Sequence, residues 1–485
     1  MPFKYCEYLL TEQDMKRKIL IENAWIVTNE DDGDIEGGSI LIEDGIIKAI
    51  GKAIVAPADC ERIDAKDFIA IPGLIDVHKH LWQGALRGAC GDMTLLGYFQ
   101  MIRQDFIASY RPEDVSIGTY ASALEMINGG TTSVFDHAHC IISPEHGDAA
   151  AQAAIESGIR GVWGYGYCPV WESDAFGKHE DRIADSRRMK SRYFPSDDSL
   201  LRMGIAITEQ QLLPFELTEM EIRAALDMNV KWTGHTHCGN GAAPISRGIH
   251  KLYAKGLLDT RAVLSHCNEF SFNDFMMMKE VGAHFASSPD SEIYMGITKP
   301  VNFIEAVAAG IDISLGTDTV AVMSADMFAN MRLSMNFARH QINHPRAAGF
   351  EAVLDQKITV RDIFRWATIN GAKTLGIDHL VGSLKVGKRA DIVLIDASHS
   401  NLAPVTDPVS TLVMHGQVSN VDTVIIDGQI RKRHGKLVGI DRAKLSADLK
   451  ASHEFLISRT PQRQRDLSRE VERWSERLQQ VAIEE

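Results

Sequence analysis

The feature that most constrains the fold is a repeated alternation, in the middle of the chain, between short apolar runs and amphipathic stretches. The runs lack the strict two-residue alternation of a strand with one solvated face, and so suit strands that are buried on both faces. There are eight of them, at residues 69–77, 131–137, 161–168, 202–208, 230–237, 262–266, 283–288 and 311–317. The stretches between them, such as 221–229 and 302–309, have helical spacing. Eight strand–helix units predict an α/β fold, a (β/α)8 TIM barrel.

The two ends of the chain resemble each other and differ from this middle part. Residues 19–52 alternate apolar and polar side chains between Gly and Asp clusters, with Asp44-Gly45 as a tight turn. The same texture returns at 391–396 and 421–435. We therefore expect a small β-sandwich built from both chain ends. The predicted domains are 1–72 and 380–442 for the two parts of the sandwich, 73–379 for the barrel, and 443–485 for a helical tail.

The predicted tail is interrupted at Thr460-Pro461, because proline breaks a helix. Its second half carries a narrow apolar stripe at heptad spacing, made by Leu467, Val471, Trp474, Leu478 and Val481. Packing on the protein's own surface and a contact between subunits both account for such a stripe.

Composition narrows the class of function. Lys+Arg minus Asp+Glu is 51 − 65 = −14, which argues against nucleic-acid and anionic-membrane partners because both need a basic face. The sequence has no apolar run of the roughly 18 residues that span a bilayer, and its first residues lack the apolar core of a signal peptide. The 7 cysteines include no CxxC pair, so disulfides and a thiolate zinc site are disfavoured. These features favour a cytoplasmic protein.

Histidines stand at the ends of several predicted strands. His78 and His80 close the first run, and residues two apart on a strand face the same side. His237, His266 and Asp318 close the fifth, sixth and eighth runs. In a barrel these positions meet at the carboxyl end, where the active sites of this fold lie. Imidazole and carboxylate ligands without thiolate predict a divalent metal, with Zn²⁺ first and Fe²⁺ or Mn²⁺ as alternatives.

Five short motifs carry a resemblance to the amidohydrolase superfamily. They are PGLIDVHKH at 72–80, GGTTSVFD at 129–136, HTH at 235–237, SHC at 265–267 and GTD at 316–318, and the segment 367–396 is similar to the return from the barrel into the β-domain. The sequence most resembles the branch of cytosine, guanine and S-adenosylhomocysteine deaminases and triazine hydrolases. That resemblance implies a homodimer or higher homo-oligomer acting on a small molecule.

The resemblance also implies a ligand set. One metal per chain would be held by His78, His80, His237 and Asp318, while His266 would hydrogen-bond the metal-bound water. Two-metal members use a carboxylated Lys at the end of strand four, and the fourth run, RMGIAITEQQ, contains none. The metal would lower the pKa of the water, and Asp318 would accept its proton.

One position departs from the family pattern. Three residues after the strand-five His, where this branch normally has a proton-transferring Glu, the chain has Asn240, and an amide does not exchange protons as a carboxyl does. Glu209, after strand four, is a possible replacement, although an ion-paired Glu is the commoner fate. We predict a metal-dependent aminohydrolase or deaminase for an N-heterocyclic substrate. Hydrolysis of an amide or carbamate, displacement of an amine or halide, and a non-catalytic metal-binding barrel are the alternatives.

Further polar residues are candidates for substrate contact. Trp82 and Gln83 follow the HxH pair, and His139 follows the second strand. His235, two residues before His237, could face the site, and a role in supporting the metal ligands is favoured.

Overall fold

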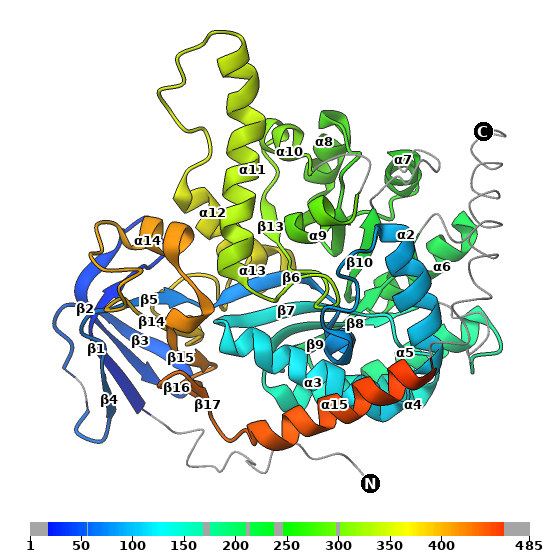
Figure 1. The fold of residues 1–485 in the computed structure, drawn as a ribbon, viewed down its shortest axis with the longest axis horizontal. Coiled ribbons are helices and arrows are strands. Elements are labelled where there is room, and N and C mark those ends of the chain that lie inside the picture. Colours follow the sequence, from blue (N-terminus) through cyan, green and yellow to red (C-terminus); the bar gives the residue numbers. More distant parts are fainter. Residues whose placement is uncertain are drawn as a thin grey trace.

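The computed structural model describes residues 18–55, 57–167, 175–209, 214–236, 246–296 and 301–459. Within them the chain forms an eight-stranded parallel sheet and a nine-stranded mixed sheet, which lie side by side in Figure 1.

The parallel sheet is the predicted barrel. Its strands follow chain order, and every neighbouring pair is parallel. They are β6 (Leu74–Lys79), β7 (Thr131–Ala138), β8 (Arg160–Gly166), β9 (Leu201–Ala206), β10 (Lys231–Thr236), β11 (Ala262–His266), β12 (His284–Ser287) and β13 (Ile313–Leu315). Each of the eight apolar runs overlaps one of these strands, so the barrel prediction is confirmed.

The helices lie outside the strands. In chain order they are η1 (Leu81–Leu86), α2 (Leu95–Tyr98), η2 (Phe99–Phe106), η3 (Ile107–Ser109), α3 (Pro112–Asn128), α4 (Pro144–Ser157), α5 (His179–Tyr193), α6 (Phe215–Asp227), α7 (Ser246–Ala254), α8 (Phe272–Val281), α9 (Pro289–Tyr294), α10 (Phe303–Ala309), α11 (Met327–Ala348), α12 (Val360–Trp366) and α13 (Ile369–Leu375). The Ser271 hydroxyl accepts a hydrogen bond from the backbone N–H of Asp274 at the start of α8. The Asp274 carboxylate accepts one from the backbone N–H of Ser271, and the two bonds form a capping box. In the described part of the chain no helix combines the length and the apolar character needed to cross a membrane.

Apolar side chains fill the interior of the barrel below the carboxyl ends of its strands, so the barrel is a packed core. The buried cluster there includes Ile75, Val77, Phe135 and Val162 from the strands. Leu375 of α13 belongs to the same cluster. Packing at this level leaves the carboxyl ends of the strands as the place for polar groups.

The mixed sheet joins the two chain ends. Its order is β17-β16-β15-β14-β5-β1-β2-β3, with β4 beside β1. The bounds are β1 (Lys18–Ile26), β2 (Ile35–Glu43), β3 (Ile46–Gly51), β4 (Glu61–Asp64), β5 (Phe68–Pro72), β14 (Ile392–Asp396), β15 (Val421–Ile426), β16 (Gln429–Arg433) and β17 (Lys436–Leu437), with α14 (Pro408–His415) and η5 (Val418–Asn420) in the connection. Central β5 pairs with β1 and β14, so residues far apart in the sequence make one sheet.

Two details of this sheet bear on the sequence predictions. Asp44 and Gly45 both have positive φ, 51° and 74°, as a two-residue turn between twisted strands requires. The apolar run 69–77 divides at Gly73 into β5 of the mixed sheet and β6 of the barrel. The nine strands form one continuous hydrogen-bonded sheet that both chain ends build, as the sequence predicted for the small β-domain.

The described part of the tail is the single helix α15 (Arg442–Arg459), which lies along the barrel beside α3 (Figure 1). Ser452 donates a 2.7 Å hydrogen bond to Asp114, and His453 Nδ1 lies 2.8 Å from the carbonyl oxygen of Ala85 in η1. Leu456 is fully buried. The predicted heptad stripe, Leu467 to Val481, lies outside the described residues.

Candidate metal centre at the barrel mouth

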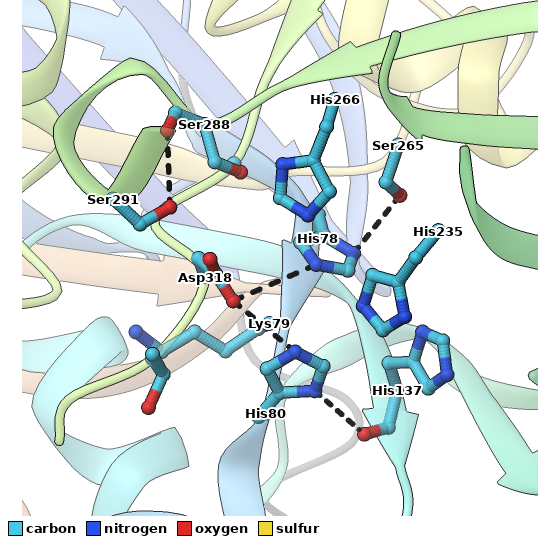
Figure 2. A network of polar contacts seen from close by, with 12 residues as sticks. His78, Lys79, His80, His137, His235, Ser265, His266, Ser288, Ser291 and Asp318 are labelled. Atoms are coloured by element: carbon cyan, nitrogen blue, oxygen red, sulfur yellow. Dashed lines mark hydrogen bonds and ion pairs between the residues drawn. The ribbon is translucent and has the colours of Figure 1, made fainter. Parts of the chain in front are cut away.

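The centre is built where the barrel closes. Lys79, at the end of β6, pairs with Asp318, just after β13. The backbone of Asp318 bonds both neighbours of Lys79: its N–H donates to His78 at 2.8 Å, and its carbonyl accepts from His80 at 2.9 Å. In this register both imidazoles and the carboxylate project to the same side of the seam (Figure 2).

The three side chains are close enough to share one ion. The Nε2 atoms of His80 and His78 lie 3.1 and 3.6 Å from Oδ1 of Asp318. His78 Nε2 is buried and has no hydrogen-bond partner within the described residues. These nitrogen and oxygen donors, without a thiolate, are the set that zinc and similar divalent metals prefer. The residues present therefore fit such an ion.

Each imidazole is oriented by a bond to its other nitrogen. Nδ1 of His78 lies 3.0 Å from the Ser265 hydroxyl, and Nδ1 of His80 lies 2.9 Å from the backbone oxygen of His137 (Figure 2). Because the carbonyl only accepts, His80 Nδ1 is the donor and Nε2 is free to bind a metal. Metal-binding histidines are commonly held in this way.

His266 and Asp318 adopt an uncommon backbone conformation. Their φ angles are 77° and 54°, in the left-handed region that side chains other than glycine rarely enter. Such strain costs about 1 kcal/mol or more and clusters at functional sites. In this conformation the ring of His266 lies 4.9 Å from that of His78, measured between centroids. Its Nδ1 lies 3.0 Å from Glu292.

Burial and neighbours set the charges of these groups. Burial raises the pKa of Asp318, but the bonds from His78 and His80 outweigh it and hold that pKa well below its usual range. Burial lowers the pKa of His78 to about 3. Burial also lowers the pKa of His266, yet the bond to Glu292 leaves it raised overall. The centre therefore combines an ionised carboxylate with a neutral His78.

More imidazoles stand on the facing side of the mouth, from β7 and β10. The rings of His137 and His139 are tilted, with centroids 4.2 Å apart, and His137 stacks on His235 at 4.3 Å. His235 Nδ1 is 3.1 Å from Glu209, which in turn pairs with Arg103 at 2.6 Å. The sequence left two roles open for Glu209, proton transfer or an ion pair, and in the structure it is ion-paired.

A small cavity borders this centre, with about 20 Å³ open to the centres of water-sized molecules. Its polar wall includes His80, His235, His266 and Asp318. The other described residues of the wall come from α2, η2, α9 and the residue after α9, and are Leu95, Tyr98, Phe99, Arg103, Ser291 and Met295. Apolar side chains around a few polar groups are the usual lining of a small-molecule site.

Some predicted site residues lie elsewhere. His237 and Asn240 fall outside the described residues. Trp82 is buried against Tyr110, with ring centroids 5.1 Å apart. Gln83 donates to Tyr98 at 2.6 Å and accepts from Thr319. His139 and Glu209 are also buried. None of these four is among the described residues that line the cavity.

Two lysines near the site face away from it, as the sequence predicted. Lys79 Nζ donates to the hydroxyl of Thr317 at 3.0 Å, on the side opposite the histidines (Figure 2). Lys231 begins β10 at the other end of the barrel and donates to Thr260 at 2.8 Å.

Sequence reasoning missed Glu292 and Arg103. Glu292 lies in α9, 26 positions after the His266 that it contacts. Arg103 lies in η2, a short π-helix. Neither residue follows a barrel strand directly, so strand-end counting does not find them. His235 lines the cavity, which is the first of the two positions that the sequence left open for it.

An eight-stranded parallel barrel whose mouth gathers histidines and one aspartate beside a cavity defines a class of metal-dependent hydrolase. The amidohydrolase family model matches residues 69–431, well over half of the chain. The chain therefore belongs to the amidohydrolase family.

Curated relatives cover nearly the whole chain. A 5'-deoxyadenosine deaminase of Methanosarcina mazei is 28% identical over 462 residues, which cover 91% of this chain and 99% of that protein. A 5-methylthioadenosine/S-adenosylhomocysteine deaminase of Acetivibrio thermocellus is 29% identical over 450 residues, covering 89% and 98%.

Solved structures share the fold. An adenosine deaminase from Xanthomonas campestris with bound zinc has a TM-score of 0.79 at 23% identity and covers 91% of this chain and 99% of its own. A mutant of atrazine chlorohydrolase from Arthrobacter aurescens TC1, complexed with zinc and atraton, has a TM-score of 0.78 at 23% identity, covering 90% and 100%.

Proposed function

We propose that this protein is an aminohydrolase that uses one catalytic divalent metal, zinc first, to hydrolyse a C–N bond of a small N-heterocyclic substrate. His78, His80, His237 and Asp318 would hold the metal. The observation that supports this most is the barrel seam, where backbone pairing of Lys79 with Asp318 sets two histidines and a carboxylate together beside a cavity.

The metal's contribution would be Lewis-acid activation of water. Asp318 is suited to accept the proton of the attacking water, because it is ionised and buried and its Oδ1 faces both imidazoles. His266 carries a proton on Nδ1 toward Glu292, so its other nitrogen is directed to the mouth. There it would orient the water or stabilise charge that develops on the substrate.

The cavity wall suits a planar, weakly polar ring. Leu95, Phe99 and Met295 supply apolar and aromatic surface, and Arg103 is already paired with Glu209. The curated relatives in the comparison are deaminases of adenosine derivatives. We therefore place purine nucleosides first among substrates.

A second candidate is hydrolytic displacement of an amine or halide, or hydrolysis of an amide or carbamate. Asn240 favours it, because that position lacks the carboxyl that would protonate a ring nitrogen. The structural likeness to an atrazine chlorohydrolase is compatible with this chemistry.

Ammonia release from a panel of substrates separates the two. We expect release from at least one purine, pyrimidine, pterin or triazine with the zinc-loaded enzyme. Amine or halide release without ammonia would favour the second candidate. An Asn240→Glu variant sharpens the test: greater ammonia release from a nucleobase would indicate ordinary deamination, and a sharp loss would indicate that the pocket needs a neutral group there.

We also propose a cytoplasmic homodimer or higher homo-oligomer. Its support is the heptad stripe of residues 467–481 together with membership of the family. Truncation after Thr460 would remove the stripe and keep α15, so we expect smaller species by sedimentation with the barrel still folded. An unchanged assembly would argue against this role of the stripe.

A further inference from the structure

The mouth holds more imidazoles than one metal requires. Beyond His78, His80 and His266, three histidines from β7, the residue after it, and β10 gather beside Glu209. Their rings lie against one another, with centroids 4.2 Å apart for His137 and His139, and 5.3 Å for His139 and His235.

Three of these groups converge on one point. One ligand atom each from His139, His235 and Glu209 lies within 4.8 Å of the other two. His139 Nε2 is 3.8 Å from Glu209 Oε1, and His235 Nδ1 is 3.1 Å from the same oxygen. The three belong to the ends of different strands, so the barrel itself brings them together.

Two of the histidines are buried with unmet hydrogen-bonding capacity. His137 and His139 are each 1% exposed, and neither nitrogen of either ring has a hydrogen-bond partner among the described residues. A buried polar group left unsatisfied costs about 1–3 kcal/mol. These four ring nitrogens beside Glu209 are therefore donors and acceptors that no described residue uses, as a ligand site requires.

The donor types suit a cation. Imidazole nitrogens and a carboxylate oxygen, without a thiolate, are ligands that Zn²⁺ and similar divalent metals take.

We propose that His139, His235 and Glu209, with His137 adjoining, form a second divalent-metal site that takes a borderline cation such as Zn²⁺ or Co²⁺. This site uses none of the predicted catalytic ligands. It holds its ion more weakly than the catalytic centre, because the Arg103 guanidinium already occupies Glu209 at 2.6 Å. The one ion per chain predicted from the sequence is then the tight one.

The site also borders the catalytic centre. The His139 ring lies 4.2 Å from the ring of His80, and His235 lines the cavity. The second ion would therefore sit next to the bound substrate without replacing the catalytic metal.

Metal titration of the full-length protein tests the proposal. Zinc content measured across a series of buffered free-zinc concentrations should rise to one equivalent and then to a second. Co²⁺ titration should show two successive visible absorption changes. His139→Gln and Glu209→Gln should each abolish the second equivalent and keep the first, with His139→Gln decisive if loss of the Arg103 partner prevents Glu209→Gln from folding.

Two further variants complete the test. His146→Gln removes a buried histidine outside the mouth, bonded to Ser143 and Tyr110, and should keep both equivalents. His78→Ala should lose the tight equivalent and keep the weak one. Saturation of the parent at one equivalent, a second equivalent that survives His139→Gln, or loss of both in His78→Ala would overturn the second site. Absence of the tight equivalent from the parent would instead contradict the proposed catalytic metal.

Discussion

Two clusters of buried charge in this protein differ in how completely they are paired. Where the barrel meets the mixed sheet, Arg160 of β8 donates to both oxygens of Asp391, at 2.7 and 2.9 Å, and to Asp427 at 2.8 Å. Asp391 also accepts from the backbone of Asp427 at 2.8 Å. At the mouth, by contrast, Nε2 of His78 and both ring nitrogens of His137 and His139 have no hydrogen-bond partner in the part of the chain that the structure describes.

The contrast separates a structural cluster from a functional one. A buried ion pair whose every oxygen is bonded holds two elements in register and offers nothing to a ligand. Buried imidazoles with unmet nitrogens lower stability unless an ion, water or substrate completes them. Substitutions should therefore affect stability at the first cluster and metal binding or turnover at the second.

The largest effect is expected for His80→Ala. Loss of a ligand at the seam should remove the tightly held metal and nearly all activity together, while the barrel stays folded. Metal analysis after dialysis, steady-state turnover and circular dichroism check this. His146→Ala, a buried histidine away from the mouth, should keep its metal. Full metal content in His80→Ala would show that the seam is not the ligand set.

Asp318→Asn should lower turnover by roughly 10²–10⁴-fold, the range that general-base assistance supplies. Asparagine still offers a carbonyl oxygen to the metal but cannot take a proton from water. Metal content should therefore fall less than in His80→Ala. Turnover close to that of the parent would refute the proton-accepting role of Asp318.

Asp391→Asn should lower stability and leave metal binding and turnover intact, unlike the two substitutions at the mouth. Loss of one partner of the buried pair should cost about 3 kcal/mol of stability, which a lower urea midpoint and melting temperature would reveal. Asp59→Asn, at an exposed ion pair with Lys18, should leave stability almost unchanged, because solvent screens such a pair. Metal content and turnover of folded Asp391→Asn should match the parent; loss of metal would break the distinction between the clusters.

Glu292→Gln should have the smallest effect. It removes the charge that Nδ1 of His266 faces at 3.0 Å, so the imidazole is oriented less firmly. Partners of this kind are worth roughly tenfold in activity or metal affinity, and we expect a loss in kcat with metal retained. Glu305→Gln, in the first turn of α10, is the matched control and should leave kcat unchanged.

Much of the fold could be predicted because it depends on local pattern. Buried parallel strands have a characteristic apolar sequence, and each of the eight runs overlaps one. The tight turn at Asp44-Gly45 and the Ser271 capping box also follow from residues next to one another. The division of run 69–77 at Gly73 was not visible, since both halves are equally apolar and only pairing assigns β5 to one sheet and β6 to the other.

The site was predictable to the same extent. His78, His80, His266 and Asp318 stand at strand ends, and the barrel brings all strand ends to one mouth, so counting strands was enough to bring them together. Glu292 and Arg103 reach the mouth from α9 and η2, whose paths no strand pattern specifies.

The sequence by itself determined the barrel, the strand-end histidines and the type of metal they suit, because these follow from periodicity and ligand chemistry. Only the tertiary structure decided which polar groups are completed by protein partners and which are not. It bonded both oxygens of Asp391 to Arg160 and paired Glu209 with Arg103, and within the described ranges it left the ring nitrogens of His137 and His139 without hydrogen-bond partners. Partnership between buried groups depends on which elements pack together, and residues 106 positions apart, such as Arg103 and Glu209, meet only when the chain has folded.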